Sequence, residues 1–196
     1  AEYQAKYTVY DDIVLLAPDG AVLARLDAGQ ALATSHDPVL AQALAGPGHV
    51  ECFGPTDLRA DGRPALRYAH RIDGPHGRPL GVLVLRFRFD NEMTHIFDGV
   101  ADARMEMAIV LIGDDQRVVA SNDDAHVPLG ARLARVEPGG VRLTTFSGRE
   151  YLAVCCASHG YQGYPGPGWR AQAMVSLLTA FRQRGQRADA GSPLNV

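Results

Sequence analysis

Two short apolar runs separated by a turn stand near the start of the chain. Residues 13–16 and 22–26 flank Pro18-Asp19-Gly20. Proline presets the φ angle of a turn and glycine tolerates a positive one, so this arrangement predicts a β-hairpin. The alternation of apolar strand and polar turn is therefore the first structural signal in the sequence.

The same pattern returns later in the chain. Residues 109–112 and 118–121 flank a second polar turn over residues 113–116. When the two hairpins are aligned, Leu15-Leu16 falls on Leu111-Ile112. A repeat at this long spacing predicts two structural units of similar topology rather than a solenoid.

Helix and strand signals fill the segment between the hairpins. Asp37 is a candidate N-cap, Pro38 occupies the first helical position, and Gly46 ends the predicted helix. A second helix follows Asp90, with its apolar residues on one face at helical spacing. Three strands are predicted between these two helices, at residues 49–53, 65–72 and 80–89.

The second half repeats this order with less helix. Strands are predicted at residues 141–146, 150–157 and 169–175, and a helical stripe follows at Leu177, Leu178 and Phe181. Each half is thus an antiparallel sheet of about five strands with flanking helices, in an α+β fold whose sheets need helices and loops to cover them. We expect one unit over residues 1–99, a second over 100–184, and a linker or tail over 185–196.

Several of these segments resemble one family of sensor domains. The stretches YDDI at residues 10–13 and LAPDGAVLA at 16–24 resemble the opening hairpin of a Cache unit, and PLGVLV at 79–84 resembles its closing strand. Residues 109–121 resemble the hairpin of a membrane-proximal unit. The loop and strand from Gly160 to Trp169 resemble those of methyl-accepting chemotaxis receptors. The chain therefore resembles a double Cache (PAS-like) sensor domain over residues 10–181.

The resemblance implies the input domain of a bacterial receptor, which binds a small polar molecule such as a carboxylate or an amino acid in the first unit. It also implies an extracytoplasmic location and membrane attachment only through segments outside this chain. Family members carry a long N-terminal helix, whereas only residues 2–9 precede the first strand here. That helix lies either upstream or is lacking, and a cytoplasmic location stays open.

Arg86 and Arg88 are candidate ligand-binding residues. Period two places both on one face of the predicted strand with Val82 and Val84. Either this guanidinium pair faces a cavity and holds a ligand carboxylate, or the face is solvated near the end of the strand.

Tyr68 and His70 share one face of their predicted strand, opposite Arg67, Ala69 and Arg71. They either line a pocket or are ordinary half-buried strand residues. Asp73 follows the strand directly, and the resemblance implies that an acidic residue there meets the ammonium group of an amino-acid ligand.

Trp169 belongs to a late aromatic cluster that is interleaved with Gly and Pro. The spacing of Gly160, Gly163, Gly166 and Gly168 does not suit phosphate binding, because no lysine follows and the prolines remove backbone donors. A rigid, aromatic-packed turn is expected instead. Trp169 then either walls a cavity of the second unit or fills its core.

Composition and charge exclude several functions. A net charge of −3 with no basic stripe argues against nucleic acid as a partner. The His and Cys residues lack zinc-site spacing, so no metal or cofactor is expected. Only one of Cys155 and Cys156 can face the core of a strand, where cysteine acts as a small apolar residue.

Two further hypotheses compete with ligand sensing. The chain is alternatively a ligand-free interaction domain, possibly forming a homodimer through surfaces presented by its twin units, with both interiors filled by side chains. It is otherwise an enzyme with an unrecognised site. No GxSxG, HExxH or Walker motif occurs, so we expect no enzymatic activity.

Overall fold

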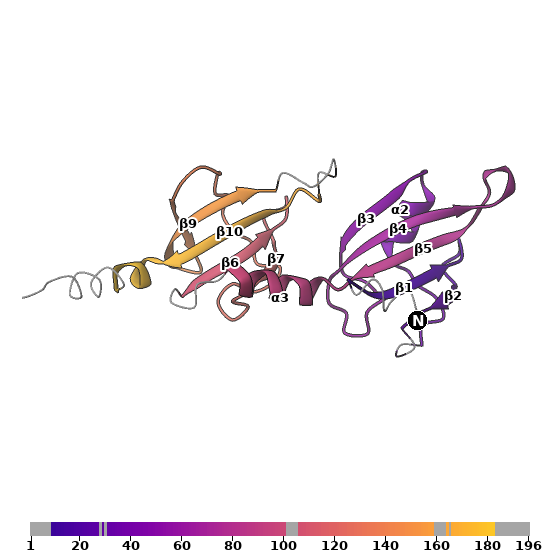
Figure 1. The fold of residues 1–196 in the computed structure, drawn as a ribbon, viewed down its shortest axis with the longest axis horizontal. Helices are drawn as coiled ribbons and strands as arrows, with labels where there is room; N and C mark the ends of the chain where they lie inside the picture. The colour runs from indigo at the N-terminus through magenta and orange to yellow at the C-terminus, as the bar shows by residue number, and fades with distance from the viewer. Residues whose placement is uncertain are drawn as a thin grey trace, which may run out of the picture. The chain divides into compact units, whose positions relative to one another are not determined.

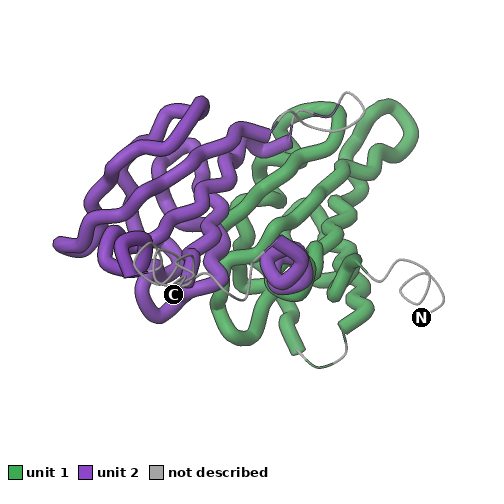
Figure 2. The backbone as a smooth tube through the Cα atoms, turned by 60° about the vertical axis from the view of Figure 1, so that its left-hand side comes forward, with its two compact units in different colours: residues 1–92 green, residues 93–196 purple. Residues whose placement is uncertain are grey.

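Two five-stranded antiparallel sheets organise the chain, one in each half (Figure 1). The computed structural model describes residues 9–27, 29, 31–100, 106–158, 164 and 166–182. The chain divides into unit 1, Ala1–Glu92, and unit 2, Met93–Val196 (Figure 2). The division expected from the sequence, after residue 99, lies within the same helix, α3 (Phe89–Val100).

The sheet of unit 1 has the order β2-β1-β5-β4-β3. Its strands are β1 (Tyr10–Leu16), β2 (Val22–Arg25), β3 (His49–Gly54), β4 (Ala65–Asp73) and β5 (Pro79–Phe87). The last strand in sequence therefore lies in the centre, between β1 and β4. Helix α2 (Pro38–Leu44) connects β2 to β3, and a short 3-10 turn η1 (Pro75–Gly77) connects β4 to β5.

The sheet of unit 2 has the order β7-β6-β10-β9-β8, which is the same topology. Its strands are β6 (Met107–Ile112), β7 (Val118–Ser121), β8 (Arg142–Phe146), β9 (Arg149–Ala157) and β10 (Arg170–Ser176). Residues 177–182 are helical. The predicted α+β class and the repeated strand order are confirmed.

The two hairpins agree in register as well as in order. Leu16 pairs with Val22 in unit 1, and Ile112 pairs with Val118 in unit 2. Each hairpin also has a register shift at the same place, between Leu15 and Leu16 or between Leu111 and Ile112. The alignment predicted from the sequence is therefore the structural alignment, and it assigns each residue of one sheet an equivalent in the other.

Helix α2 covers one face of the first sheet, which we call its inner face. Asp37 is the N-cap: its side chain accepts a hydrogen bond of 2.8 Å from the backbone N–H of Val39. Val39 and Ala43 are buried against β-strand residues that include Val14 and Val84. The capping and the burial pattern follow from the Asp-Pro start and the apolar spacing that predict this helix.

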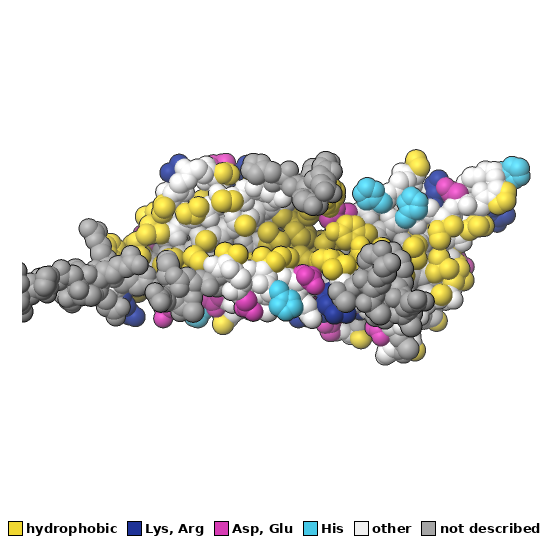
Figure 3. Space-filling view, in the orientation of Figure 1, with side chains coloured by type: hydrophobic (Ala, Val, Ile, Leu, Met, Phe, Trp, Pro, Cys, Tyr) yellow, Lys and Arg dark blue, Asp and Glu magenta, His cyan; other side chains and the backbone are white. Residues whose placement is uncertain are grey.

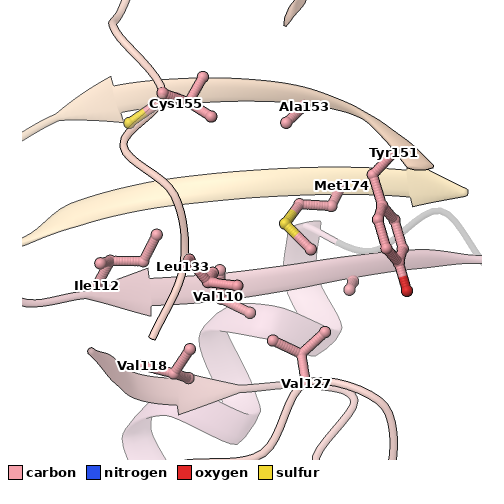
Figure 4. Close-up of a cluster of buried hydrophobic side chains, with 11 residues drawn as sticks. Val110, Ile112, Val118, Val127, Leu133, Tyr151, Ala153, Cys155 and Met174 are labelled. Carbon is pink, nitrogen blue, oxygen red and sulfur yellow. The ribbon is translucent and has the colours of Figure 1, made fainter. Parts of the chain in front are cut away.

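In unit 2 a loop replaces that helix. Val127, Leu133 and Val136 descend from the segment between β7 and β8 onto the inner face of the sheet. They pack against inward residues of the strands, among them Val110 and Met174 (Figure 4). A loop offers fewer side chains to a sheet face than a helix does, so the filling of this interior depends on the residues of the strands themselves.

A buried ion pair joins α2 to the sheet of unit 1. Arg67 on β4 is 1% exposed, and its Nη1 donates to Asp37 Oδ2 at 2.8 Å. The same nitrogen donates to the carbonyl of Pro55 at 3.0 Å, and the hydroxyl of Thr56 donates to Asp37. Asp37 is thus both the helix cap and the counter-ion of a buried guanidinium.

The three cysteines are free thiols in different environments. Cys155 faces the core of unit 2 and is 2% exposed, whereas Cys156 on the opposite face is exposed and Cys52 is intermediate. The expectation that only one of the adjacent pair faces the core is confirmed. Burial raises the pKa of the Cys155 thiol above its ordinary value, which lowers its thiolate fraction.

The Asp37–Arg67 pair yields a stability prediction. Asp37→Asn keeps the shape of the cap but leaves a buried guanidinium without its counter-ion, so the free energy of unfolding should fall by about 3 kcal/mol. Asp61→Asn is the matched control, because Asp61 forms an ion pair with Arg59 at 2.6 Å while its side chain is 49% exposed. That change should cost at most about 1 kcal/mol. Urea unfolding followed by circular dichroism measures both, and equal losses would contradict the assignment.

A second prediction concerns the adjacent thiols. In the folded protein at pH 8, iodoacetamide should alkylate Cys156 while Cys155 stays protected, because only Cys156 is accessible and Cys155 holds its proton more tightly. Fragment-ion mass spectrometry of the peptide that holds both residues separates the two sites. In urea both should react, and equal rates in the folded protein would show the β9 orientation to be incorrect.

Candidate ligand-binding sites

Arg86 lies on the inner face of unit 1, as strand alternation predicts, but it is neither solvated nor available. The residue is 7% exposed. Its Nε donates to Asp11 Oδ1 at 2.7 Å, and its Nη1 donates to the carbonyl oxygen of Leu58. The interpretation of a solvated strand end is wrong for Arg86, and the protein's own acceptors hold the donors that a ligand carboxylate would need.

A second arginine shares these acceptors. Arg25 on β2 donates from Nε to Asp12 Oδ2 at 2.7 Å and from Nη2 to the Leu58 carbonyl at 2.6 Å. Asp12 is fully buried and also accepts from the backbone N–H groups of Ile13, at 2.9 Å, and Asp27, at 3.0 Å. Every carboxylate oxygen of Asp12 thus has a donor, which is what a buried charge requires.

We call Asp12, Arg25, Arg67 and Arg86, with their carboxylate partners, the inner charge cluster. The sequence pattern did not single out Asp12, Arg25, Arg67 or Asp37. A signal was present for two of them, because Asp12 alternates with Val14 on β1 and Arg67 alternates with Ala69 on β4. A charged residue at an inward position of a strand indicates either a paired buried charge or a ligand contact.

Tyr68 and His70 lie on the face opposite Arg86. Arg67 pairs with Arg86 across β4 and β5, whereas Tyr68 pairs with Leu85, and successive residues of a strand point to opposite faces. His70 is exposed and Tyr68 is half-buried, with burial as the main cause that raises the pKa of Tyr68 to about 12. A single ligand site made by Arg86, Tyr68 and His70 is therefore excluded by geometry.

The other predicted residues of unit 1 are also separate. The strand ends at Phe87, so Arg88 lies between β5 and α3 rather than on the predicted strand, where its backbone N–H donates to the Val9 carbonyl at 2.7 Å. Asp73 is exposed and forms an ion pair with Arg71 at 2.9 Å. Neither residue adjoins a shared pocket with Arg86 in the described part of unit 1.

Trp169 belongs to unit 2 and lines a hollow of about 210 Å³ with Leu111, Cys156 and Ala171. These residues point to the outer face of the second sheet, away from its core. Residues 160–163 of the predicted Gly/Pro loop lie outside the described residues. Trp169 is therefore placed at a cavity wall, as one of the two alternatives for it proposed, but on a different sheet from Arg86.

The larger cavity of the described structure lies on the inner face of unit 2 and has a volume of about 490 Å³. Its apolar wall comes from Met107 and Ala108 on β6, Val127 in the covering loop, and Met174 on β10. A cavity of this size accommodates a small organic molecule. No residue of this cavity was predicted as a site residue from the sequence.

Polar groups surround the same cavity. Asp123 Oδ1 lies 2.9 Å from His126 Nδ1, and the hydroxyl of Thr179 donates to Glu106 Oε2 at 3.2 Å. Asn122 uses its amide on the backbone of β6, where it accepts from the Ile109 N–H at 2.6 Å. These groups already have partners within the protein.

Tyr151 and Arg149 are different. Both lie on the inner face of β9 and line the cavity. Tyr151 is 6% exposed, and its ring lies beside Met174 with the hydroxyl directed away from β9 (Figure 4). Among the described residues, neither the Tyr151 hydroxyl nor the Arg149 guanidinium has a hydrogen-bond or ion-pair partner.

The structural alignment of the two sheets explains why unit 2 is hollow at this place. Asp12 pairs with Arg86 in unit 1, and Ala108 pairs with Met174 at the equivalent position of unit 2. Arg67 also pairs with Arg86, and its equivalent is Ala153, which pairs with Met174. Arg25, opposite Val14, corresponds to Ser121, opposite Val110. Every member of the charged quartet is thus replaced by a small or apolar residue.

The described residues hold no grouping of three or more His, Cys, Asp or Glu side chains suited to a metal ion. Among the same residues, no helix combines the length and the apolar character that crossing a bilayer requires.

Comparison with solved structures identifies the fold. The extracellular domain of rpHK1S-Z16, a protein classed as a histidine kinase, has a TM-score of 0.66 at 18% identity, covering 92% of this chain and 76% of that one. The ligand-binding domain of Mlp24, solved with asparagine, has a TM-score of 0.65 at 14% identity, covering 89% and 71%. That of the Pseudomonas fluorescens chemoreceptor CtaA, in complex with L-alanine, has a TM-score of 0.62 at 14% identity, covering 91% and 77%.

No protein-family model and no curated protein matches the sequence. At identities this low the structural likeness establishes the fold alone. The chain has the tandem PAS-like fold of receptor sensor domains, with two antiparallel five-stranded sheets in succession.

Proposed function

We propose that this chain is the ligand-sensing input domain of a bacterial signal-transduction receptor. The observation that carries the proposal is the shared tandem arrangement. It extends over about nine-tenths of the chain to domains solved with asparagine and with L-alanine. A cavity with a buried, unpartnered hydroxyl adds support from this chain itself. The ligand is a small polar molecule, and the chain performs no chemical step.

Sensing requires that the ligand bind one conformation better than another. A molecule bound between a sheet and its covering loop stabilises the arrangement that encloses it, and this differential affinity shifts a two-state equilibrium in an attached output domain. We propose that the domain lies on the extracytoplasmic side of the membrane, attached by segments outside this chain.

A ligand-free interaction domain is the second candidate, and two observations favour it. The interior of unit 1 is filled by α2, the apolar core and the inner charge cluster. The outer face of its sheet carries half-buried apolar residues, including Leu15, Leu83 and Leu85, and apolar side chains gather over the sheets in the space-filling view (Figure 3). The cavity of unit 2 favours sensing, because a pure interaction domain has no use for it.

A thermal-shift screen with amino acids, organic acids and amines tests the proposal. A ligand at a hundredfold excess over its dissociation constant should add about 2.7 kcal/mol to the free energy of unfolding, which raises the midpoint by several degrees. Titration calorimetry on each hit measures the stoichiometry. No shift with any compound, together with concentration-dependent dimerisation in sedimentation experiments, would favour the interaction domain instead.

A further inference from the structure

We infer that the inner cavity of unit 2 is a binding site for a small monocarboxylate with a short apolar tail, and that unit 1 holds no ligand on its inner face. The inference rests on the proposed sensing function and names its site and ligand class. It places recognition in the second unit, whereas the sequence predicts a ligand in the first.

The ligand class follows from the groups that lack partners. Arg149 and Tyr151 are two residues apart on β9, so both side chains leave the same face of the strand. A guanidinium and a phenolic hydroxyl side by side can donate to the two oxygens of one carboxylate. The hydroxyl is the stronger indicator, because a tyrosine that is 6% exposed normally has a hydrogen-bond partner for its oxygen.

The remaining lining groups limit the ligand further. Asp123 and Glu106 are engaged with His126 and Thr179, and their negative charges at the rim disfavour a second carboxylate on the ligand. The apolar wall of Ala108, Val127 and Met174 suits a short hydrocarbon tail. One carboxylate and one apolar end therefore match the chemistry of the site.

Unit 1 cannot offer an equivalent site. At the same places of its sheet, the side chains of Arg67 and Arg86 occupy the space next to Asp12, and ion pairs hold them there. Their equivalents, Ala153 and Met174, carry no charge and leave the cavity open. The two units thus share a topology, but only the second has room and free donors.

The first test uses isovalerate and benzoate as probes, with isovaleramide and benzamide as uncharged controls and succinate as a dicarboxylate. Methyl-¹³C labelling of the four methionines gives a residue-level readout. Isovalerate or benzoate should shift the methyl signals of Met107 and Met174, which line the cavity, and leave that of Met93 on α3 unchanged. Succinate and the amides should bind at least about tenfold more weakly, since each loses or adds one charge interaction.

Variants separate recognition from folding. Tyr151→Phe removes a hydroxyl that has no partner among the described residues, so thermal stability without ligand should be unchanged while the dissociation constant rises roughly tenfold. Arg149→Gln should weaken binding by a similar factor and abolish the preference for the acid over its amide. Arg135→Gln is the matched control, because Arg135 is exposed and forms an ion pair with Glu137 at 2.6 Å.

A filling variant tests the cavity itself. Ala108→Leu places a larger side chain into the space and should abolish isovalerate binding. Its circular dichroism spectrum should match that of the unchanged protein. If no monocarboxylate shifts Met107 or Met174, or if the three site variants bind like Arg135→Gln, the inference is overturned.

These outcomes are distinct from failure of the proposed function. A ligand of another class that binds equally well to Tyr151→Phe, Arg149→Gln and Ala108→Leu would leave sensing intact and move the site elsewhere. An absence of any small-molecule binding in the wider screen would remove both the inference and the proposed function.

Discussion

The burial of three guanidinium groups in unit 1 determines how the first half of the chain is built. Arg67 is 1% exposed and Arg86 is 7% exposed, and the Arg25 side chain is 7% exposed. A charge so far from water must be paired and hydrogen-bonded. The partners are Asp11, Asp12 and Asp37 with the Leu58 carbonyl. These contacts connect the N-terminal strand, the start of α2, the loop before β4 and the central strand β5.

Unit 2 shows that the topology itself does not depend on those charges. Its strand order and the register shift in its hairpin match those of unit 1, although Ala108, Ser121, Ala153 and Met174 stand where the charges would be. Strand alternation and the opening turn are common to both halves, so they are sufficient to specify the sheet. The charge cluster instead specifies how the interior is filled and which loops are held against it.

The sequence predicted the features that depend on local pattern. Hairpins, the Asp37 cap, the faces of β4, β5 and β9, and the repeat of strand order all follow from turn chemistry and period two. Alternation assigns Arg86 to a face, but it does not show that Asp11, far away along the chain, lies beside it on a neighbouring strand. It also cannot show that Ala108 and Ala153 leave a cavity, because an alanine at an inward position is equally typical of a filled core. The strand that ends at Phe87 rather than residue 89 reflects the start of α3, whose apolar spacing overrides the strand propensity of Phe89.

The contrast between the two interiors has an energetic consequence for sensing. In unit 1, removing one member of a buried ion pair is costly, and this holds the inner face in a single arrangement. In unit 2, the cavity lacks the contacts that a filled core would have, and the Tyr151 hydroxyl lacks a partner among the described residues. The unit therefore has unfavourable terms that an occupant of the right size and polarity can reverse. A small molecule changes the stability of a structure most where the empty state is incompletely satisfied, and by that criterion the responsive half of this chain is the second.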